Sequence, residues 1–421
     1  MKVLWCTSIQ LPMMRRKHGM SPLSGGSWME ALRGALEIHA PEIELGIASG
    51  GESINEPFHE GNATYFTVPV KPLRSRVVNI FNNWQSDIRT SWDISSLLPI
   101  IFHFKPDIIH IHGTENHFGL VADQVSMPVL ISLQGFLTQC LPYQLSGLHW
   151  SELSKAFFNM EFLKGRGLFH STWSMRPKAI RELAIMSLCR HFVGRTEWDK
   201  AFTKLTSPSA TYHHCDELLR PEFQGSTWEQ KDSVPGLIFT ILNCEPRKGL
   251  LLLLDSMSLL QKSGYKHMKF RIAGNIVDTP IWPIVKKRLA TNKLSQDTIE
   301  WLGPQTADQI IAELIHASVF VHPSAVDNSP NSLCEAMMVG TPCIASYVGG
   351  VPSIIKEDKE CLMFPTGDAY ALAGQIIRLL EDRTLAIRLS QNARTSAQRR
   401  HDPKRVAERM TEIYRSIIRN P

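Results

Sequence analysis

One stretch of the sequence, residues 321–351, constrains the fold more strongly than any other. The apolar run that ends at Val321 predicts a buried parallel strand, and the polar residues after it predict a turn. Residues 332–339 have helical spacing and stop at Gly340, because glycine readily adopts the left-handed conformation that ends a helix. Residues 343–346 predict the next strand. This order of strand, turn, helix and strand is the repeating unit of a parallel α/β sheet.

The turn and the helix start in this stretch predict a ligand site. Free backbone N–H groups and the helix dipole favour an anion beyond the carboxyl end of the sheet. Two carboxylates, Asp327 in the turn and Glu335 on the helix, can face the same crevice, where they suit hydroxyl groups rather than an anion. A ligand that needs both kinds of partner is a sugar nucleotide. The alternative is an ordinary buried turn with two solvated acids.

This stretch resembles the donor-binding motif of glycosyltransferase family 4, which has two acidic residues separated by seven, with a Pro-Asn pair between them. The resemblance implies that Glu335 holds the nucleotide ribose and that Asp327 contacts the transferred sugar. Glutamate is commoner at the first position, so the shorter arm of Asp327 bears on sugar preference. The resemblance further assigns the residues between them to the donor: Asn328, Ser329, Pro330, Asn331 and Ser332.

A second turn of this type joins a strand predicted at 236–242 to a helix predicted at 250–261. Lys248, just before Gly249, is placed to neutralise a diphosphate as a point charge. The alternative is a solvated lysine at a helix start.

Family 4 proteins have an arginine just after this strand and a Lys-Gly pair at the helix start, both on the donor phosphates. Lys248-Gly249 matches the pair, whereas Asn243 stands near the arginine position and Arg247 is a substitute out of register. A further strand ends at Gly274, a turn where a base or diphosphate can lie close.

The first half of the chain begins with a strand predicted at 2–6 and a long polar loop that holds residues 13–18. The loop ends at Gly25-Gly26, before a helix predicted from Trp28. Two glycines allow a phosphate to approach the backbone closely, and they are equally typical of a tight turn. Their place matches the glycine pair of family 4.

Histidines alternate along a strand predicted at 107–113. His110 and His112 share one face, but only Glu115 lies near enough to join them as a metal ligand, so polar lining of a substrate crevice is favoured. We assign His112 and Glu115 to the acceptor side. Arg195, at the end of a later strand, is a candidate anion contact there.

The strand predicted at 129–133 ends at Gln134, where many family 4 enzymes have a histidine that reaches the reacting sugar. An amide can hydrogen-bond a hydroxyl group but cannot titrate. Retaining transfer can still use the leaving phosphate as the proton acceptor. The implied catalytic group is therefore Asp327, Glu335, Lys248 and Gln134.

Residues 140–195 are basic and rich in aromatic side chains. They predict an amphipathic acceptor region that touches a membrane surface carrying a lipid-linked acceptor. Two core-packed helices with solvated Lys and Arg explain the pattern equally well. The charged residues are Lys155, Lys164, Arg166, Arg176, Lys178, Arg181, Arg190 and Arg195, with Glu152, Glu161 and Glu182.

Composition limits the class of protein. A length of 421 residues with 43% hydrophobic and 20% charged residues fits a soluble globular protein of two or three domains. Eight scattered cysteines without a CxxC pair predict a reducing, cytoplasmic location. No secretory signal or membrane span is expected. The net charge of +5 is too modest for a nucleic-acid partner.

Two series of alternating strands and helices predict an α/β protein with two doubly wound, Rossmann-like domains facing a central cleft. The resemblance implies the GT-B fold. We expect an N-terminal acceptor-binding domain at 1–215, a linker at 216–235 and a donor-binding domain at 236–402. A last helix at 403–421 is expected to cross back to the first domain.

The implied activity is retaining transfer of a hexose from a nucleoside diphosphate sugar to a saccharide or lipid-linked acceptor, in polysaccharide or lipopolysaccharide biosynthesis at the inner membrane face. No Asp-x-Asp pair occurs, so we expect no metal, and no cofactor besides the sugar-nucleotide co-substrate. The alternatives are a GT-B sugar-nucleotide epimerase and a catalytically inactive sugar-nucleotide-binding subunit.

Overall fold

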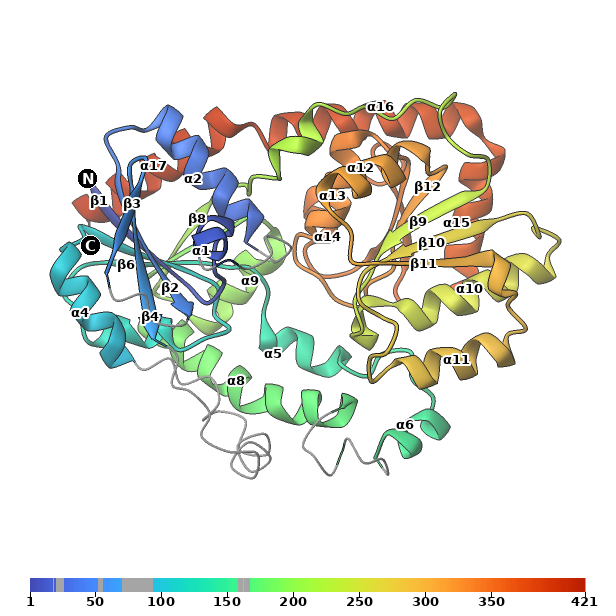
Figure 1. Ribbon diagram of the computed structural model, residues 1–421, viewed down its shortest axis with the longest axis horizontal. Coiled ribbons are helices and arrows are strands. Elements are labelled where there is room, and N and C mark those ends of the chain that lie inside the picture. The colour runs from blue at the N-terminus through green and yellow to red at the C-terminus, as the bar shows by residue number, and fades with distance from the viewer. Residues whose placement is uncertain are drawn as a thin grey trace.

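The computed structural model describes residues 1–17, 19, 26–51, 56–69, 94–157, 162 and 167–420. Within them the chain forms two β-sheets, each covered by helices on both faces, that lie side by side (Figure 1). This is the predicted α/β architecture of two Rossmann-like domains. Coverage on both faces explains why most of the central strands are rich in apolar residues.

The first sheet has the strand order β3-β4-β2-β1-β5-β6-β7-β8, and all neighbours are parallel except β3 and β4. The order changes direction at β1, so a ligand crevice is expected beyond the carboxyl ends of β1 and β5. The strands are β1 (Lys2–Thr7), β2 (Glu44–Gly51), β3 (Phe58–Glu60), β4 (Ala63–Pro69), β5 (Ile108–His112), β6 (Val129–Ser132), β7 (His191–Gly194) and β8 (Thr211–His214).

Helices α4, α8 and α9 pack on one face of the first sheet, and α2 packs with the C-terminal helix on the other. A long excursion that includes α5 and α6 reaches toward the second domain (Figure 1). The helices are α1 (Pro12–Lys17), α2 (Ser27–His39), α4 (Ile94–Phe104), α5 (Leu137–Cys140), α6 (Trp150–Phe157), α8 (Leu168–Leu188) and α9 (Glu197–Thr206).

The second sheet is entirely parallel, with the order β11-β10-β9-β12-β13-β14. Its order changes direction at β9, so the crevice lies beyond the ends of β9 and β12. The strands are β9 (Leu237–Ile241), β10 (Lys269–Ala273), β11 (Ile299–Gly303), β12 (Val319–His322), β13 (Cys343–Tyr347) and β14 (Leu362–Pro365).

Helices α10, α11 and α15 pack on one face of the second sheet, and α12 and α13 pack on the other with the second half of α16. The helix α12 begins at a capping box formed by Thr306 and Gln309, which satisfies two orphan N–H groups. The helices are α10 (Leu250–Lys262), α11 (Trp282–Thr291), α12 (Ala307–His316), α13 (Asn331–Val339), α14 (Val351–Ile354), α15 (Ala369–Glu381) and α16 (Arg383–Arg400).

The last helix, α17 (Pro403–Arg419), crosses back to the first domain, which confirms the sequence prediction (Figure 1). Its apolar stripe, which includes Val406, Met410 and Tyr414, is buried against the first sheet and α2. The hydroxyl of Tyr414 accepts a hydrogen bond from Trp5 Nε1 at 3.0 Å. The last helix therefore belongs to the core of the first domain.

Several elements differ from the sequence prediction. The polar loop expected at 13–18 is wrong for most of its length, because α1 forms there and buries Met14. The strands β3 and β8 and the helix α11 are additional; the two strands are very short edge elements with little apolar pattern. Of the helix predicted at 77–104, the part before 94 lies outside the described residues. No described helix is both long and apolar enough to span a membrane.

Candidate functional site

Two turns at the carboxyl edge of the second sheet pack directly on each other. The short 3-10 turn Pro246–Lys248 follows β9 and ends at Gly249, which has a φ of 84°. A Cβ atom at Gly249 would lie 2.0 Å from the carbonyl oxygen of Pro323, so only glycine allows this approach. The N–H of Ala325 donates to the carbonyl of Arg247 at 2.7 Å. These contacts bring the predicted phosphate turn and the predicted sugar turn together.

Lys248 and Asp327 meet across these two turns. The Nζ atom of Lys248 lies 2.7 Å from Oδ2 of Asp327, and Nε2 of His322 lies 3.4 Å from the same oxygen. Burial alone would raise the pKa of Asp327, but the ammonium and the imidazole hold that pKa well below its usual range. Asp327 is thus an ionised hydrogen-bond acceptor with a cation beside it.

The helix α13 begins at Asn331, four residues after Asp327. Its N-cap residue is Pro330, and no described side chain caps its first turn. The N–H groups of Asn331 and Ser332 belong to that turn, where an α-helix leaves its donors unpaired, while Ser329 is buried beside it. This helix start can bind an anion.

Glu335 lies one turn further along α13 and pairs with a residue that the sequence analysis did not select. Arg220 donates from Nε to Oε1 at 2.7 Å and from an Nη atom to Oε2 at 2.8 Å. Burial raises the pKa of Glu335, and the hydrogen bonds from Arg220 oppose that rise. The predicted ribose carboxylate is therefore held by a two-point clamp.

Asn328 connects the donor turn to the first domain. Its Oδ1 accepts a hydrogen bond from Thr196 Oγ1 at 2.6 Å, and its Nδ2 donates to Asp199 Oδ2 at 3.1 Å. The same Nδ2 donates to the carbonyl of Gln134 at 3.4 Å. The predicted residues Asn328 and Gln134 are therefore neighbours across the cleft.

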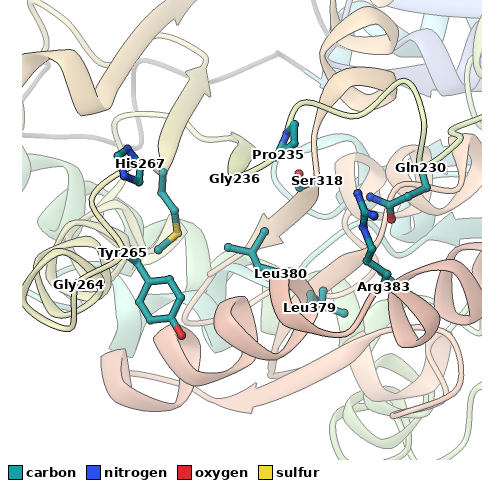
Figure 2. Close-up of a pocket in the computed structure, with 12 residues that line it drawn as sticks. Gln230, Pro235, Gly236, Gly264, Tyr265, His267, Ser318, Leu379, Leu380 and Arg383 are labelled. Atoms are coloured by element: carbon teal, nitrogen blue, oxygen red, sulfur yellow. The ribbon is translucent and has the colours of Figure 1, made fainter.

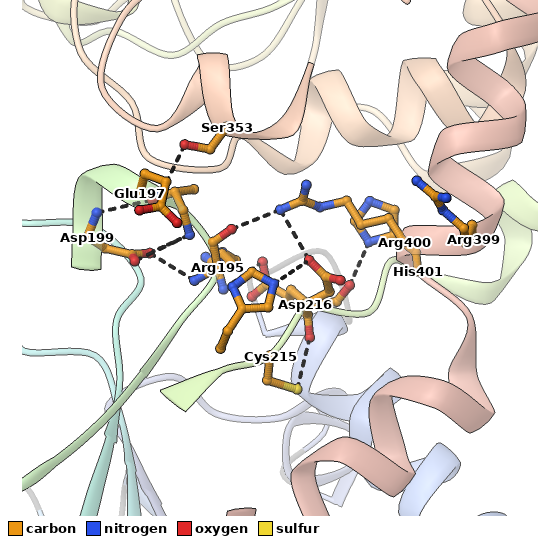
Figure 3. A network of polar contacts seen from close by, with 12 residues as sticks. Arg195, Glu197, Asp199, Cys215, Asp216, Ser353, Arg399, Arg400 and His401 are labelled. Atoms are coloured by element: carbon orange, nitrogen blue, oxygen red, sulfur yellow. Dashed lines mark hydrogen bonds and ion pairs between the residues drawn. The ribbon is translucent and has the colours of Figure 1, made fainter. Parts of the chain in front are cut away.

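Arg195 is part of a buried polar network rather than an open anion contact. Its guanidinium lies 3.1 Å from Glu217 Oε2 and donates to Gln134 Oε1 at 3.1 Å. Its carbonyl accepts a hydrogen bond from Arg400, which also pairs with Asp216 at 3.2 Å (Figure 3). The network links β7, the segment after β8 and the end of α16, so it fixes one side of the junction between the domains.

The histidines of β5 are buried, so the expectation that they line an open crevice is wrong for His110. Its ring bonds Tyr414 at 2.6 Å and Ser132 at 2.7 Å, which makes it a structural link to α17. His112 is 4% exposed and packs edge-on against Trp5 and Trp28. Burial lowers the pKa of His112 to about 3, so its ring is neutral at physiological pH.

Glu115 folds back over the end of β5. Its Oε2 occupies the space where a side chain at Gly113 would begin. Burial and the nearby Glu182 raise the pKa of Glu115 to about 7. Glu182 itself is fully buried and accepts hydrogen bonds from Thr114 at 2.6 Å and from the N–H of Thr138 at 2.8 Å.

A cavity of about 410 Å³ lies between the domains next to the phosphate turn. It is bounded by Ser146 and His149 of the first-domain excursion and by Gly249 and Thr366 of the second domain. Beside it, Arg288 of α11 pairs with Glu152 of α6 at 2.6 Å and with Asp255 at 2.7 Å. This ion-pair cluster holds the excursion against the second domain.

A second cavity, of about 370 Å³, lies at the opposite edge of the second sheet (Figure 2). Gly236, Met268 and Ser318, which directly precede β9, β10 and β12, line it with Tyr265 and Arg383. It is therefore separate from the turns that carry Lys248 and Asp327.

Other predicted residues have local structural roles. Gly26 is the left-handed N-cap of α2, and Gly25 lies outside the described residues. Asn243 is exposed and accepts from the N–H of Glu245 at 3.0 Å, which shapes its own turn. Arg247 pairs with Glu245. Gly274, with a φ of 119°, allows the end of β10 to touch the Leu242 carbonyl.

The basic segment 140–195 is only partly a solvated face. Arg181 and Arg195 are buried, as are their acidic neighbours Glu152 and Glu182. These four charged side chains lie in the interior, so they are not part of a solvated basic face. Glu161, Lys164 and Arg166 lie outside the described residues. No group of three or more His, Cys, Asp or Glu side chains among the described residues is arranged to hold a metal ion.

Three residues that take part in these contacts were not selected by the sequence analysis. Arg220 lies in the predicted linker, 115 positions from Glu335. His322 ends β12, and Arg288 lies on the unpredicted helix α11. The available signal for Arg220 was its place beside a Pro and close to a Phe in a segment that otherwise has no pattern.

Residues 228–396, less than half of the chain, match the family model described as Glycosyl transferases group 1. N-acetyl-alpha-D-glucosaminyl L-malate synthase of Bacillus anthracis is 28% identical over 133 residues, which cover 32% of this chain and 34% of that protein. The putative colanic acid biosynthesis glycosyltransferase WcaL of Escherichia coli K12 is 27% identical over 150 residues, which cover 34% and 36%. The matches span about a third of the length of these relatives.

Solved structures resemble the whole chain. Sucrose-phosphate synthase from Thermosynechococcus elongatus superposes with a TM-score of 0.73 and 17% identity over 100% of both chains. Anabaena HepE in complex with UDP superposes with a TM-score of 0.65 and 12% identity, over 99% of this chain and 100% of that one. At these identities the likeness shows the fold, and the fold is GT-B. The family match and the partial relatives support the glycosyltransferase superfamily for the part of the chain that they cover.

Proposed function

We propose that this chain is a retaining glycosyltransferase of the family 4 type. It moves a sugar from a nucleoside diphosphate sugar to a saccharide or lipid-linked acceptor in the assembly of a cell-surface polysaccharide. The observation that carries the proposal is the Lys248–Asp327 pair beside the uncapped start of α13. Partners for a diphosphate and for sugar hydroxyl groups lie there side by side.

Each residue of the pair has a defined role in the proposal. The Lys248 ammonium and the first N–H groups of α13 stabilise the negative charge that develops on the leaving diphosphate. The ionised Asp327 accepts hydrogen bonds from hydroxyl groups of the transferred sugar, and Glu335 accepts them from the ribose. WcaL, a relative named for colanic acid biosynthesis, and HepE, which holds UDP, support this substrate class.

The first domain supplies the acceptor side in this proposal. Gln134 reaches the cleft through its contacts with Asn328 and Arg195, and Glu115 stands at the end of β5. A hydroxyl acceptor that binds between them meets the donor only when the two domains are closed. Closure also excludes water, which would otherwise hydrolyse the donor.

We also assign the segment 140–195 to contact with the cytoplasmic face of a membrane that carries the acceptor. Trp150 is 88% exposed and Ile180 is 70% exposed, and Arg176 stacks on the half-exposed Trp173. Such side chains suit the boundary between headgroups and acyl chains. Sedimentation with anionic vesicles, weakened by Trp150→Ser and Ile180→Ser, is the expected result; no sedimentation of the unchanged protein contradicts this assignment.

A donor screen followed by product analysis tests the activity. Thermal shift with UDP-, GDP-, ADP- and TDP-sugars identifies the donor, and the product formed with a saccharide acceptor is then examined by NMR. The same anomeric configuration in donor and product is expected. An inverted linkage contradicts retention, and conversion of the donor without an acceptor indicates the epimerase instead. No observation in the described structure favours the epimerase or the inactive subunit.

A further inference from the structure

The clamp between Arg220 and Glu335 has more constraints than an ordinary ion pair. The guanidinium donates to both carboxylate oxygens, at 2.7 and 2.8 Å, and its centre lies 4.5 Å from the centroid of the Phe223 ring. Phe223 is fully buried in the core beside α13. Glu335 therefore fixes the direction of the guanidinium within its plane, and the Phe223 ring fixes the orientation of that plane.

The clamp leaves part of the carboxylate available. An ionised carboxylate has about four acceptor positions, and a two-point arginine uses one on each oxygen. The remaining position on each oxygen can accept a hydrogen bond from a neighbouring hydroxyl group. Two vicinal hydroxyl groups match that arrangement, and the ribose of a nucleotide has two.

The clamp also keeps the carboxylate charged. The side chain of Glu335 is 7% exposed, and Glu222 is a second acid close enough to disfavour its ionised form. Arg220 is the cation that opposes both effects. Without it, a buried Glu335 gains a proton more readily and becomes a donor where an acceptor is needed.

We propose that Arg220 is a positioning residue that sets the ribose specificity of the nucleotide site by holding Glu335 ionised and oriented toward the 2′- and 3′-hydroxyl groups. This inference rests on the proposed function. Arg220 comes from the segment between β8 and β9, so the ribose contact is anchored to the connection between the two domains.

The test is the ratio of the dissociation constants of dideoxy and ordinary nucleotides. Calorimetry measures binding of UDP, GDP and ADP and of their 2′,3′-dideoxy counterparts to the unchanged protein, Arg220→Met, Arg220→Lys and Arg271→Met, and binding of TDP to the unchanged protein. Arg271 is a matched control, because it pairs with Glu313 on α12 of the same domain. Affinity for the dideoxy nucleotide serves as an internal check that a variant has folded.

The unchanged protein and Arg271→Met are expected to prefer the ribonucleotide by about tenfold or more, as for hydrogen bonds to a charged group. Arg220→Met should reduce the preference to less than about threefold, by the same reasoning, while its dideoxy affinity stays unchanged. Arg220→Lys should fall between them. An undiminished preference in Arg220→Met overturns the inference alone. Failure of UDP, GDP, ADP and TDP alike to bind the unchanged protein overturns the proposed function, and the inference with it. Binding of TDP alone, whose sugar has no 2′-hydroxyl group, overturns the inference only.

Discussion

The Nζ atom of Lys248 and the Oδ2 atom of Asp327 lie 2.7 Å apart and join the two ligand turns of the second sheet. The two residues are 79 positions apart in the sequence. Their contact depends on Gly249, which lets one turn pack on the carbonyl of Pro323 in the other. A cation for phosphate and an anion for hydroxyl groups are thereby fixed next to each other.

Replacing Lys248 by methionine should reduce turnover. The lysine contributes one or more charge-assisted hydrogen bonds to the leaving diphosphate, each about 1.5–3 kcal/mol, so kcat should fall about 10- to 150-fold. Steady-state kinetics with the identified donor provide the measurement. Lys200→Met, which alters only an exposed pair with Glu197, should keep the original kcat. Normal turnover in Lys248→Met would remove this lysine from the site.

Glu115 should make stability depend on pH. Its folded-state pKa of about 7 exceeds the ordinary value of 4.5, so the folded state holds the proton longer than the unfolded state does. The stabilisation is complete below about 4.5 and is lost as the pH rises through 7. Glu115→Gln should remove this loss, which is at most about 3 kcal/mol.

Urea unfolding at pH 5 and pH 8 measures this effect. The difference in the free energy of unfolding between the variant and the unchanged protein should favour the variant more at pH 8 than at pH 5. Glu60→Gln, on the edge strand β3, is measured alongside as the control for the loss of a carboxylate. An identical pH dependence in Glu115→Gln would show that Glu115 titrates normally.

Arg288 should be essential to the ion-pair cluster between α6 and α11. The side chains of Arg288 and Glu152 are 5% and 6% exposed, so Arg288→Met leaves a buried carboxylate without its cation. The expected loss of stability is about 3–5 kcal/mol. The double variant Arg288→Met with Glu152→Leu should recover most of it, because no charge then remains buried. Denaturant unfolding of both variants decides; equal losses in the single and double variants would contradict this explanation.

Transfer should not require a divalent metal. The sequence has no Asp-x-Asp pair to hold one on the diphosphate, and charge stabilisation is assigned to Lys248 and the start of α13. The initial rate should therefore be unchanged in EDTA. Activity that disappears in EDTA and returns with manganese would contradict the prediction.

The fold and several residues of the candidate site could be predicted from the sequence. Apolar strands and a stop at Gly340 predicted the second sheet closely, since both features are local. Lys248, Asp327 and Glu335 could be selected as candidates because each lies in the turn or on the helix that follows a recognisable strand. Their pairing could not be read from spacing, because it arises from the packing of one turn on another.

Contacts over long sequence distances were beyond the sequence analysis. Arg220 reaches Glu335 from a segment with no periodic pattern, and Asn328 meets Thr196 across the domain junction. His110 alternates with its neighbours as a residue that lines a crevice would, yet Tyr414 of α17 covers it. In each case the decisive partner comes from an element that folds in from elsewhere in the chain.

The central claim is that Glu335 and its neighbours bind a nucleoside diphosphate sugar. The most direct measurement is calorimetry of UDP-, GDP-, ADP- and TDP-glucose with the unchanged protein, Glu335→Gln and the matched control Glu313→Gln, which alters another arginine-paired helix glutamate. We predict that one donor binds the unchanged protein and the control alike, and binds Glu335→Gln at least about tenfold more weakly. Equal affinity in all three proteins, or no binding of any of these donors, would contradict the account.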